Sequence, residues 1–308
     1  MKQNILRGRD IISMADFSKE DILYILRVAD QVKKSNPNRL LSGCLMGSCF
    51  FEPSTRTRLS FEAAMKRLGG DVIGFADSST TSAKKGETLY DSIKIIGQYV
   101  DIIVMRHPVD GSARRAAEAT DTPIINAGDG SNQHPTQTLL DLYTIKESQK
   151  SIDGIHIALV GDLKYGRTAH SLAQALSHFN VRLYFIAPPS LQIPPHIANH
   201  VKAKQVKFSF HEKLDDVLPK LDILYMTRIQ EERFSDSMEY NRVKDVFRLT
   251  LDQLGAVRPS MRILHPLPRV REIDPSIDAT PHAYYFQQAQ NGLLVRQAVL
   301  SLVLGKIE

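Results

Sequence analysis

The sequence predicts an α/β protein of two doubly wound domains, each a parallel sheet flanked by helices. Two observations lead to this fold class. Short apolar runs alternate along the chain with segments of helical periodicity, an order typical of parallel sheets with helices on both faces. The runs also form two groups of four, separated by the polar segment 147–154. A chain of 308 residues has room for about two domains of ordinary size.

Each predicted strand is a short apolar run. The first group is Met46–Phe51, Val72–Phe75, Ile102–Met105 and Ile124–Asn126, and the second is Ile155–Val160, Leu183–Ile186, Ile223–Met226 and Arg262–Leu264. Because strands of 4–8 residues bounded by polar turns are typical of buried parallel sheets, each group predicts one sheet.

Helices are predicted between the strands. Arg58–Leu68 places apolar residues at the i, i+3, i+4, i+7 spacing of one helix face. Pro135–Lys146 begins with a proline, which suits a first helical turn. Two segments predict loops, Ser78–Thr88 and Ala187–Pro195. A last helix begins near Asn291, and its pattern leaves open which domain it packs on.

The composition excludes several classes of protein. Hydrophobic residues make up 43% and charged residues 24% of the chain, which excludes a disordered chain, a fibre and a disulfide-framework peptide. No apolar run reaches the roughly 18 residues that span a bilayer, and the N-terminus lacks the apolar core of a signal peptide. Cys44 and Cys49 lie in or beside an apolar run, which favours buried free thiols in the cytoplasm over a disulfide or a metal site.

The net charge of +5, from 39 basic and 34 acidic residues, is spread along the chain. Nucleic-acid binding is typical of a clustered basic patch, which the sequence lacks. Two interpretations of the charge remain at this point. It serves solubility, or a few arginines serve an anionic small molecule.

Basic residues follow nearly every predicted strand. Ligands of open α/β sheets bind outside the carboxyl ends of the strands, so these residues predict an anion-binding cleft between the two domains. The segments are Ser54–Arg58, Lys84–Glu87, Arg106–Pro108, His134–Gln137, Lys164–Thr168, Arg228–Gln230 and His265–Arg269.

The segment Ser54–Thr57 predicts a phosphate cradle. Pro53 ends the strand and a helix follows at once, so unpaired N–H groups and a positive helix end face the ligand side. The hydroxyls of Ser54, Thr55 and Thr57 and the guanidinium of Arg56 add donors. The alternative is a simple N-cap, and Arg106 at a parallel position favours the cradle.

Four further residues are candidates for chemistry or binding. His134 and Gln137 lie three apart across a helix start and can share one face, where a histidine acts as an acid, a base or an oxyanion donor. Arg167 and Arg228 follow separate strands of the second group, and two guanidiniums suit a dicarboxylate. The structural alternatives are a capping histidine and surface ion pairs. The segment Gly161–Thr168 matches neither a P-loop nor a dinucleotide fingerprint.

These motifs together resemble the transcarbamoylase family. The run Ser54–Arg58 is similar to its carbamoyl-phosphate motif, and Arg106–Pro108, His134–Gln137 and His265–Pro268 follow in the family's order from Ile11 to Gly305. Within the family the chain resembles the aspartate-specific branch, close to its enterobacterial members. The resemblance implies transfer of a carbamoyl group from carbamoyl phosphate to the α-amine of L-aspartate, the committed step of pyrimidine biosynthesis, without metal or organic cofactor.

The resemblance also implies a role for each domain. Residues 1–136 form the carbamoyl-phosphate domain, with a C-terminal helix of about 288–308 packed back on it, and residues 137–287 form the aspartate domain. The phosphate contacts are Ser54, Thr55, Arg56, Thr57 and Arg106. Thr57, Arg106 and His134 polarise the carbonyl, and Gln137 with the backbone of Leu267 and Pro268 holds the amide. The aspartate contacts are Lys85, Arg167, Arg228 and Gln230.

Two rival functions remain in view. The first is a transcarbamoylase for ornithine or another amine, but His265-Pro266-Leu267-Pro268 stands where that branch carries a cysteine. A cationic acceptor also needs an acidic pocket, whereas Arg167, Arg228 and Lys85 repel it. The second is a phosphate-binding module without chemistry.

The resemblance further implies a homotrimer with shared active sites, in which Ser82 and Lys85 enter the neighbouring subunit's pocket. The adjacent Lys84 leaves the choice of lysine open. Glu52 would hold Arg167 and Arg233 in a closed state, although Arg271 stands where an acidic partner of Tyr240 is expected. Arg114 and Glu118 lie where relatives contact a separate zinc-bearing regulatory chain.

Overall fold

The computed structural model describes residues 4–229, 238, 240 and 246–307, and the chain divides into two compact units. Unit 1 comprises Met1–Leu139 and Asn291–Glu308, and unit 2 comprises Leu140–Gln290. The expectations for Gln230 and Arg233 fall outside the described residues.

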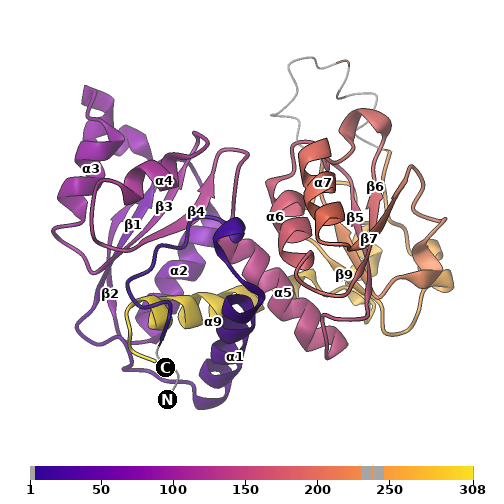
Figure 1. Cartoon of the computed structure of the whole chain (residues 1–308), viewed down its shortest axis with the longest axis horizontal. Helices are drawn as coiled ribbons and strands as arrows, with labels where there is room; N and C mark the ends of the chain where they lie inside the picture. The colour runs from indigo at the N-terminus through magenta and orange to yellow at the C-terminus, as the bar shows by residue number, and fades with distance from the viewer. Residues whose placement is uncertain (1–3, 230–237, 239, 241–245, 308) are drawn as a thin grey trace. The chain divides into compact units, whose positions relative to one another are not determined.

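Unit 1 is built on a four-stranded parallel sheet in the order β2-β1-β3-β4. Its strands are β1 (Leu45–Phe50), β2 (Asp71–Phe75), β3 (Ile102–His107) and β4 (Ile124–Asp129), and its helices include α1 (Lys19–Ser35), α2 (Thr55–Arg67), α3 (Leu89–Ile96) and α4 (Ser112–Ala117). Buried residues of α3 and α4 pack with Cys49, Ile103 and Met105 in one apolar cluster. Figure 1 shows α3 and α4 beside this sheet.

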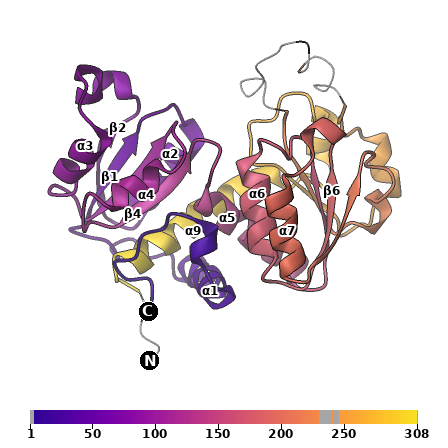
Figure 2. The same cartoon turned by 45° about the horizontal axis from the view of Figure 1, so that its top comes forward.

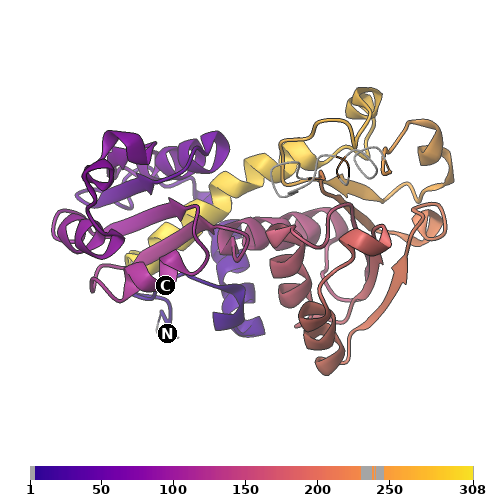
Figure 3. The same cartoon turned by 90° about the horizontal axis from the view of Figure 1, so that it is seen from above.

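The two ends of the chain meet in unit 1. The backbone N–H of Gly8 donates to the Val303 carbonyl over 2.9 Å, and Asn4 Nδ2 donates to the Leu302 carbonyl over 2.8 Å. The last helix, α9 (Tyr285–Val303), also packs on α2, because the Arg296 guanidinium lies 5.1 Å from the Phe61 ring centre. Figure 3 shows both ends side by side.

Unit 2 is built on a five-stranded parallel sheet in the order β7-β6-β5-β8-β9. The strands are β5 (His156–Val160), β6 (Arg182–Ile186), β7 (Lys207–His211), β8 (Ile223–Met226) and β9 (Arg262–Leu264), and the helices include α6 (Arg167–Leu176) and α7 (Pro195–Ala203). Helix α5 (Pro135–Gln149) begins in unit 1 and continues into unit 2. Helices α6 and α7 lie side by side over the sheet (Figure 2). The two parallel sheets confirm the predicted fold class.

Strand β7 was not predicted from the sequence. None of its residues is buried, Phe210 is 52% exposed, and a polar residue separates its two phenylalanines, so it lacks the continuous apolar run of the other strands. A strand at the edge of a sheet is covered less completely than a central one, and its sequence is correspondingly mixed. The predicted loops at 78–88 and 187–195 contain the short 3-10 helices η2 (Ser78–Thr80), η3 (Ser82–Lys85) and η4 (Pro189–Leu191).

Both cysteines are free and buried, as the sequence predicts. Burial raises the pKa of Cys49 to about 12, so its thiol stays protonated and unreactive at neutral pH. Burial also raises the pKa of Cys44. Among the described residues, no helix combines the length and the apolar character needed to cross a membrane.

Candidate active site

The candidate residues of unit 1 lie at the carboxyl edge of its sheet. Phe50, the last residue of β1, lies opposite Arg106 of β3. His107, the last residue of β3, pairs with Asp129 at the end of β4, and its carbonyl accepts the N–H of Gly130 over 2.9 Å. Since the strands are parallel, the segments that follow them emerge on one side of the sheet. We call this set the unit 1 site: Ser54, Thr55, Arg56, Thr57, Arg106, His134 and Gln137.

Helix α2 begins at this edge with its N–H groups directed outward. Ser54 occupies the N-cap position with extended backbone, but its side chain makes no capping hydrogen bond. The first turn contains no acidic residue to occupy the positive helix end. Thr57 is buried, whereas Thr55 and Arg56 are exposed. These features favour the anion cradle over the simple cap.

Arg106 is held in place by Glu52. Its Nε donates to Glu52 Oε1 over 2.7 Å, and both side chains are largely buried. Among the described residues, this ion pair engages only the Nε–H, so both Nη groups remain to donate to an anion. In this structure Glu52 therefore pairs with Arg106 in its own unit, and the expected contact with Arg233 lies outside the described residues.

His134 is presented by a turn that one carboxylate organises. Asp129 Oδ1 accepts from Asn126 Nδ2 over 2.8 Å and from the Gln133 N–H over 3.1 Å. Its Oδ2 accepts from the Gly111 N–H over 2.9 Å and from Asn132 Nδ2 over 3.0 Å. Asp129 is 1% exposed, so these four bonds replace its hydration and fix the turn that carries His134.

Gly130 is required in that turn. Its φ is +51°, which L side chains rarely adopt, and a Cβ there would lie 1.8 Å from Asp110 Oδ1 and 2.9 Å from the Asp110 backbone nitrogen. Asp110 in turn accepts the Ser131 N–H over 2.6 Å. His134 and Gln137 follow at the start of α5, where both are buried.

The candidate residues of unit 2 also lie at one edge of their sheet. Strand β8 lies between β5 and β9, and the Thr227 N–H donates to the Val160 carbonyl over 2.8 Å. Gly161 permits this approach, because a Cβ there would lie 2.3 Å from the Thr227 carbonyl oxygen. We call this set the unit 2 site: Arg167, Arg228, Leu267 and Pro268.

The two arginines of this set are half-buried. Arg167 is the first residue of α6, after a turn in which Asp162 Oδ1 accepts the Tyr165 N–H over 2.9 Å. Arg228 lies two residues beyond the end of β8. Partly buried guanidiniums bind carboxylates more strongly than exposed ones, because water screens them less.

The segment carrying Leu267 and Pro268 is anchored by a buried pair. His265 Nε2 lies 2.7 Å from Glu272 Oε1, and His265 Nδ1 accepts the Leu267 N–H over 2.8 Å. Burial lowers the pKa of His265, which keeps the ring neutral. Burial opposes ionisation of Glu272, but the hydrogen bonds from His265 and the backbone outweigh it and lower the pKa of that carboxyl.

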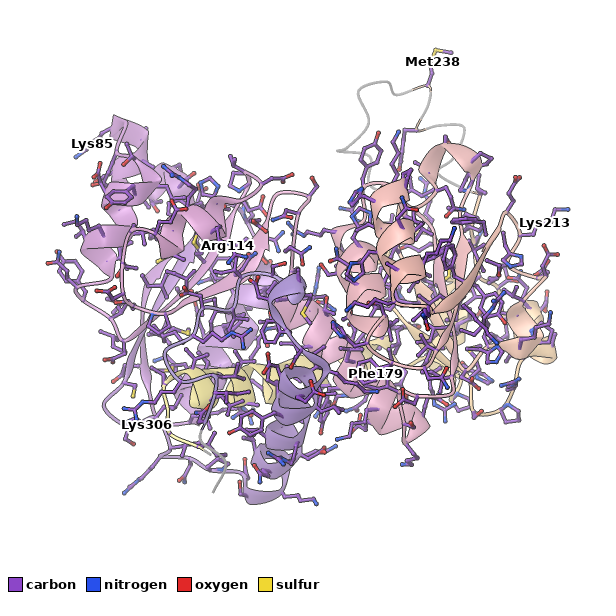
Figure 4. All side chains as sticks on the ribbon, in the orientation of Figure 1. Lys85, Arg114, Phe179, Lys213, Met238 and Lys306 are labelled. Carbon is purple, nitrogen blue, oxygen red and sulfur yellow. The ribbon has the colours of Figure 1, made fainter. Side chains whose placement is uncertain are left out.

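The loop expected to reach a neighbouring subunit is exposed. Ser82, Lys84 and Lys85 belong to η3, and all three are exposed. Figure 4 shows Lys85 at the surface of unit 1.

The sequence matches two family descriptions in tandem. Residues 9–147 match "Aspartate/ornithine carbamoyltransferase, carbamoyl-P binding domain", and residues 153–303 match "Aspartate/ornithine carbamoyltransferase, Asp/Orn binding domain". The chain therefore belongs to the aspartate/ornithine carbamoyltransferase family and is a carbamoyltransferase. This confirms the resemblance stated from the motifs.

Several individual relatives are aspartate carbamoyltransferases. The aspartate carbamoyltransferase catalytic subunit of Chromobacterium violaceum is 55% identical over 298 residues, 97% of this chain and 98% of the relative. That of Thermococcus kodakarensis is 54% identical over 303 residues, with 97% and 98% covered. Among solved structures, the M. jannaschii catalytic subunit is 51% identical, with a TM-score of 0.90 over 96% of this chain and 98% of that one. The Trypanosoma cruzi enzyme in complex with N-(phosphonacetyl)-L-aspartic acid is 38% identical, with a TM-score of 0.91 and 97% of each chain covered.

Sequence reasoning missed the residues that hold the site in shape. Asp129 and Glu272 are acidic residues in turns, and nothing in their spacing shows that each is buried and accepts several donors. The available signal was a carboxylate directly after a buried strand or beside a basic motif, which is also the pattern of an ordinary solvated turn.

We expect Asp129→Asn to lower the free energy of unfolding by about 2–3 kcal/mol, because an amide nitrogen would face buried N–H donors. Urea titration followed by circular dichroism measures the change. Asp121→Asn, at an exposed carboxylate of unit 1, is the matched control and should stay within about 0.5 kcal/mol of wild type. Equal effects of the two substitutions would contradict the role assigned to Asp129.

Proposed function

We propose that the chain transfers the carbamoyl group of carbamoyl phosphate to the α-amine of L-aspartate, giving N-carbamoyl-L-aspartate and phosphate. One observation carries the proposal. The carboxyl edge of the unit 1 sheet gathers a helix N-terminus, Arg106 and His134, and the corresponding edge in unit 2 carries Arg167 and Arg228. The identity of about 55% to aspartate carbamoyltransferase catalytic subunits supports it.

The unit 1 site would bind carbamoyl phosphate. The N–H groups at the start of α2, with the side chains of Ser54, Thr55 and Arg56, would hold the phosphate. Thr57, Arg106 and His134 would donate to the carbonyl oxygen, where negative charge develops. Gln137 and the backbone of Leu267 and Pro268 would hold the amide.

The reaction needs no redox or covalent step on the protein. The neutral amine of aspartate attacks the carbonyl carbon, a tetrahedral intermediate forms, and phosphate leaves and takes up the amine proton. The residues act by positioning two anionic substrates and by stabilising the oxyanion.

The unit 2 site favours a dicarboxylate acceptor. Arg167 and Arg228, with Lys85 and Gln230, would bind the two carboxylates of aspartate. Ornithine carries a cationic side chain instead, which two guanidiniums repel. Solved structures of the related T. cruzi enzyme are complexes with carbamoyl phosphate, aspartate or carbamoyl aspartate.

An assay with both acceptors tests the proposal. We expect carbamoyl aspartate to form from carbamoyl phosphate and aspartate, with a kcat/KM at least about 10³ times that for ornithine. The reason is that ornithine, which lacks the second carboxylate, would leave a guanidinium of the site unpaired. A colorimetric ureido assay measures both products. Faster turnover with ornithine supports the rival transcarbamoylase, and phosphate binding without turnover supports the binding module.

Two histidine substitutions test whether the activity arises from this site. His134→Ala removes one oxyanion donor and should lower kcat by about 10²–10³ while changing the KM for carbamoyl phosphate much less. His196→Ala, at an exposed histidine of α7, should keep wild-type kcat. An unchanged kcat in His134→Ala would remove His134 from its assigned role.

We also propose that the chain works as a homotrimer, with Ser82 and Lys85 serving the neighbouring subunit's site. Unit 1 exposes apolar residues on β2, on α3 and just beyond α3, namely Ile73 (47% exposed), Tyr90 (42%), Ile95 (46%) and Tyr99 (63%). Together with the exposed η3 loop, these residues support a subunit contact on this part of unit 1.

Complementation tests the shared site. Lys85→Ala and Arg56→Ala chains should each be nearly inactive, but mixed trimers contain some sites without either substitution and should regain activity. Activity after denaturation, mixing and renaturation measures the effect, and renatured single variants are the control. Mixed trimers that stay as inactive as the parents would show that each site lies within one chain.

The proposal has two wider features. Arg114 pairs with Asp16 over 2.8 Å and Arg115 with Glu118 over 2.9 Å, which gives an exposed charged surface suited to a separate zinc-bearing regulatory chain. Measuring the molecular mass of the chain with and without such a partner tests this proposal, and the absence of a complex would contradict it.

The free buried thiols support a cytoplasmic location for the enzyme, where it would act in pyrimidine biosynthesis. Cell fractionation tests this location.

A further inference from the structure

The Glu272 carboxylate bonds to both ends of the segment from His265 to Glu272. Glu272 Oε1 lies 2.7 Å from His265 Nε2, and Oε2 accepts the N–H groups of Val270 over 3.1 Å and Arg271 over 2.9 Å. One side chain thus joins both ends of the segment that carries Leu267 and Pro268. Glu272 is 8% exposed and His265 is 2% exposed, so water does not replace these bonds.

The hydrogen bonds to the two ring nitrogens of His265 fix its tautomer. The Leu267 N–H donates to His265 Nδ1, so that nitrogen is an acceptor and the proton of the neutral ring lies on Nε2. Nε2 then donates to Glu272. The other tautomer would set the Nδ1 proton against the Leu267 N–H. The backbone at Leu267, which has a φ of +56°, is therefore held through His265 by the carboxylate at 272.

A second anchor fixes the start of the segment. The His265 N–H donates to Gln288 Oε1 over 2.8 Å, and Gln288 Nε2 donates to Asp141 Oδ1 over 2.6 Å. Asp141 Oδ2 accepts from the Tyr225 hydroxyl over 2.9 Å. Asp141, Tyr225 and Gln288 are fully buried, so this chain ties the segment to the core of unit 2.

We propose that Glu272, acting through His265, is a positioning residue that sets the Leu267–Pro268 backbone to receive the carbamoyl amide. The inference rests on the proposed function, because that function assigns the amide contact to this backbone. It adds a division of labour, in which the phosphate is bound by unit 1 residues and the carboxylate at 272 affects recognition of the amide but not of the phosphate.

Glu272→Gln is the informative substitution because it keeps the size of the side chain. A glutamine has one acceptor oxygen, so its NH₂ group must face either His265 Nε2–H or the two backbone N–H groups. If the ring changes tautomer to accept from that NH₂, its Nδ1 proton meets the Leu267 N–H. Every arrangement leaves two donors opposed, and the segment must shift.

Two ligands separate amide recognition from phosphate binding. Phosphonoacetamide carries a phosphonate and a non-transferable amide, whereas inorganic phosphate lacks the amide. Isothermal titration calorimetry of the full-length chain gives both Kd values. We expect Glu272→Gln to raise the Kd for phosphonoacetamide about tenfold and to leave the Kd for phosphate unchanged, since small displacements of a positioning group carry penalties of this order or larger. The KM for carbamoyl phosphate should rise in parallel, more than kcat falls.

Tyr184→Phe is the matched control. It removes the bond between a buried phenol and His156 Nδ1, 2.9 Å long, in the same unit and away from the 265–272 segment. It should change neither Kd. If Glu272→Gln does not fold, the same two Kd values are measured for Glu272→Asp. The same result is expected, because the shorter carboxylate cannot reach both His265 and the backbone.

The outcomes distinguish this inference from the proposed function. A wild-type chain that binds phosphonoacetamide no more tightly than phosphate contradicts the proposed function. A wild-type chain that prefers phosphonoacetamide, with a Glu272 variant that keeps the same preference, contradicts only the role of Glu272. Equal weakening of both ligands also contradicts it, because that result indicates a general structural effect.

Discussion

The structure depends on the parallel direction of its strands. Because every strand of a sheet ends at the same edge, residues far apart in the sequence lie side by side wherever they follow a strand end. In unit 1 this constraint brings together the start of α2, Arg106 and the His134 turn. In unit 2 it does the same for Arg167, Arg228 and the segment after β9. In the proposed function, anion recognition depends on the side chains at those strand ends.

Buried carboxylates give these edges their shape. Glu52 orients Arg106 through one ion pair, Asp129 accepts four donors beneath His134, and Glu272 closes the segment around Leu267. In each case the carboxylate is buried or partly buried and accepts hydrogen bonds from its neighbours, so it orients them more rigidly than a fully exposed group would. The cationic edges therefore rest on acidic residues that do not themselves bind the substrates in the proposed reaction.

Much of the fold could be predicted from the sequence. In the part of the chain that the structure describes, eight of the nine strands coincide with apolar runs, and most of these are buried strands with little freedom in composition. Strand β7 could not be predicted in this way, since an edge strand alternates between polar and apolar residues. The positive φ of Gly130 and the close approach at Gly161 depend on contacts with Asp110 and Thr227, which sequence spacing does not reveal.

The candidate site could be predicted as a set of residue types but not as a geometry. The motifs at Ser54–Thr57, Arg106 and His134 carry chemistry in their own side chains, and so they are visible in the sequence. The positions of Asp129 and Glu272 matter through hydrogen bonds to backbone groups of other residues, which leave no periodic signal. The division of labour between binding and positioning therefore becomes apparent only in three dimensions.

A crystal structure of the chain with N-(phosphonacetyl)-L-aspartate bound tests the central claim most directly. The account predicts the phosphonate at the start of α2 and at Arg106, and both carboxylates within hydrogen-bond distance of Arg167 and Arg228. A complex in which these guanidiniums face bulk solvent, with the ligand bound elsewhere, would contradict it.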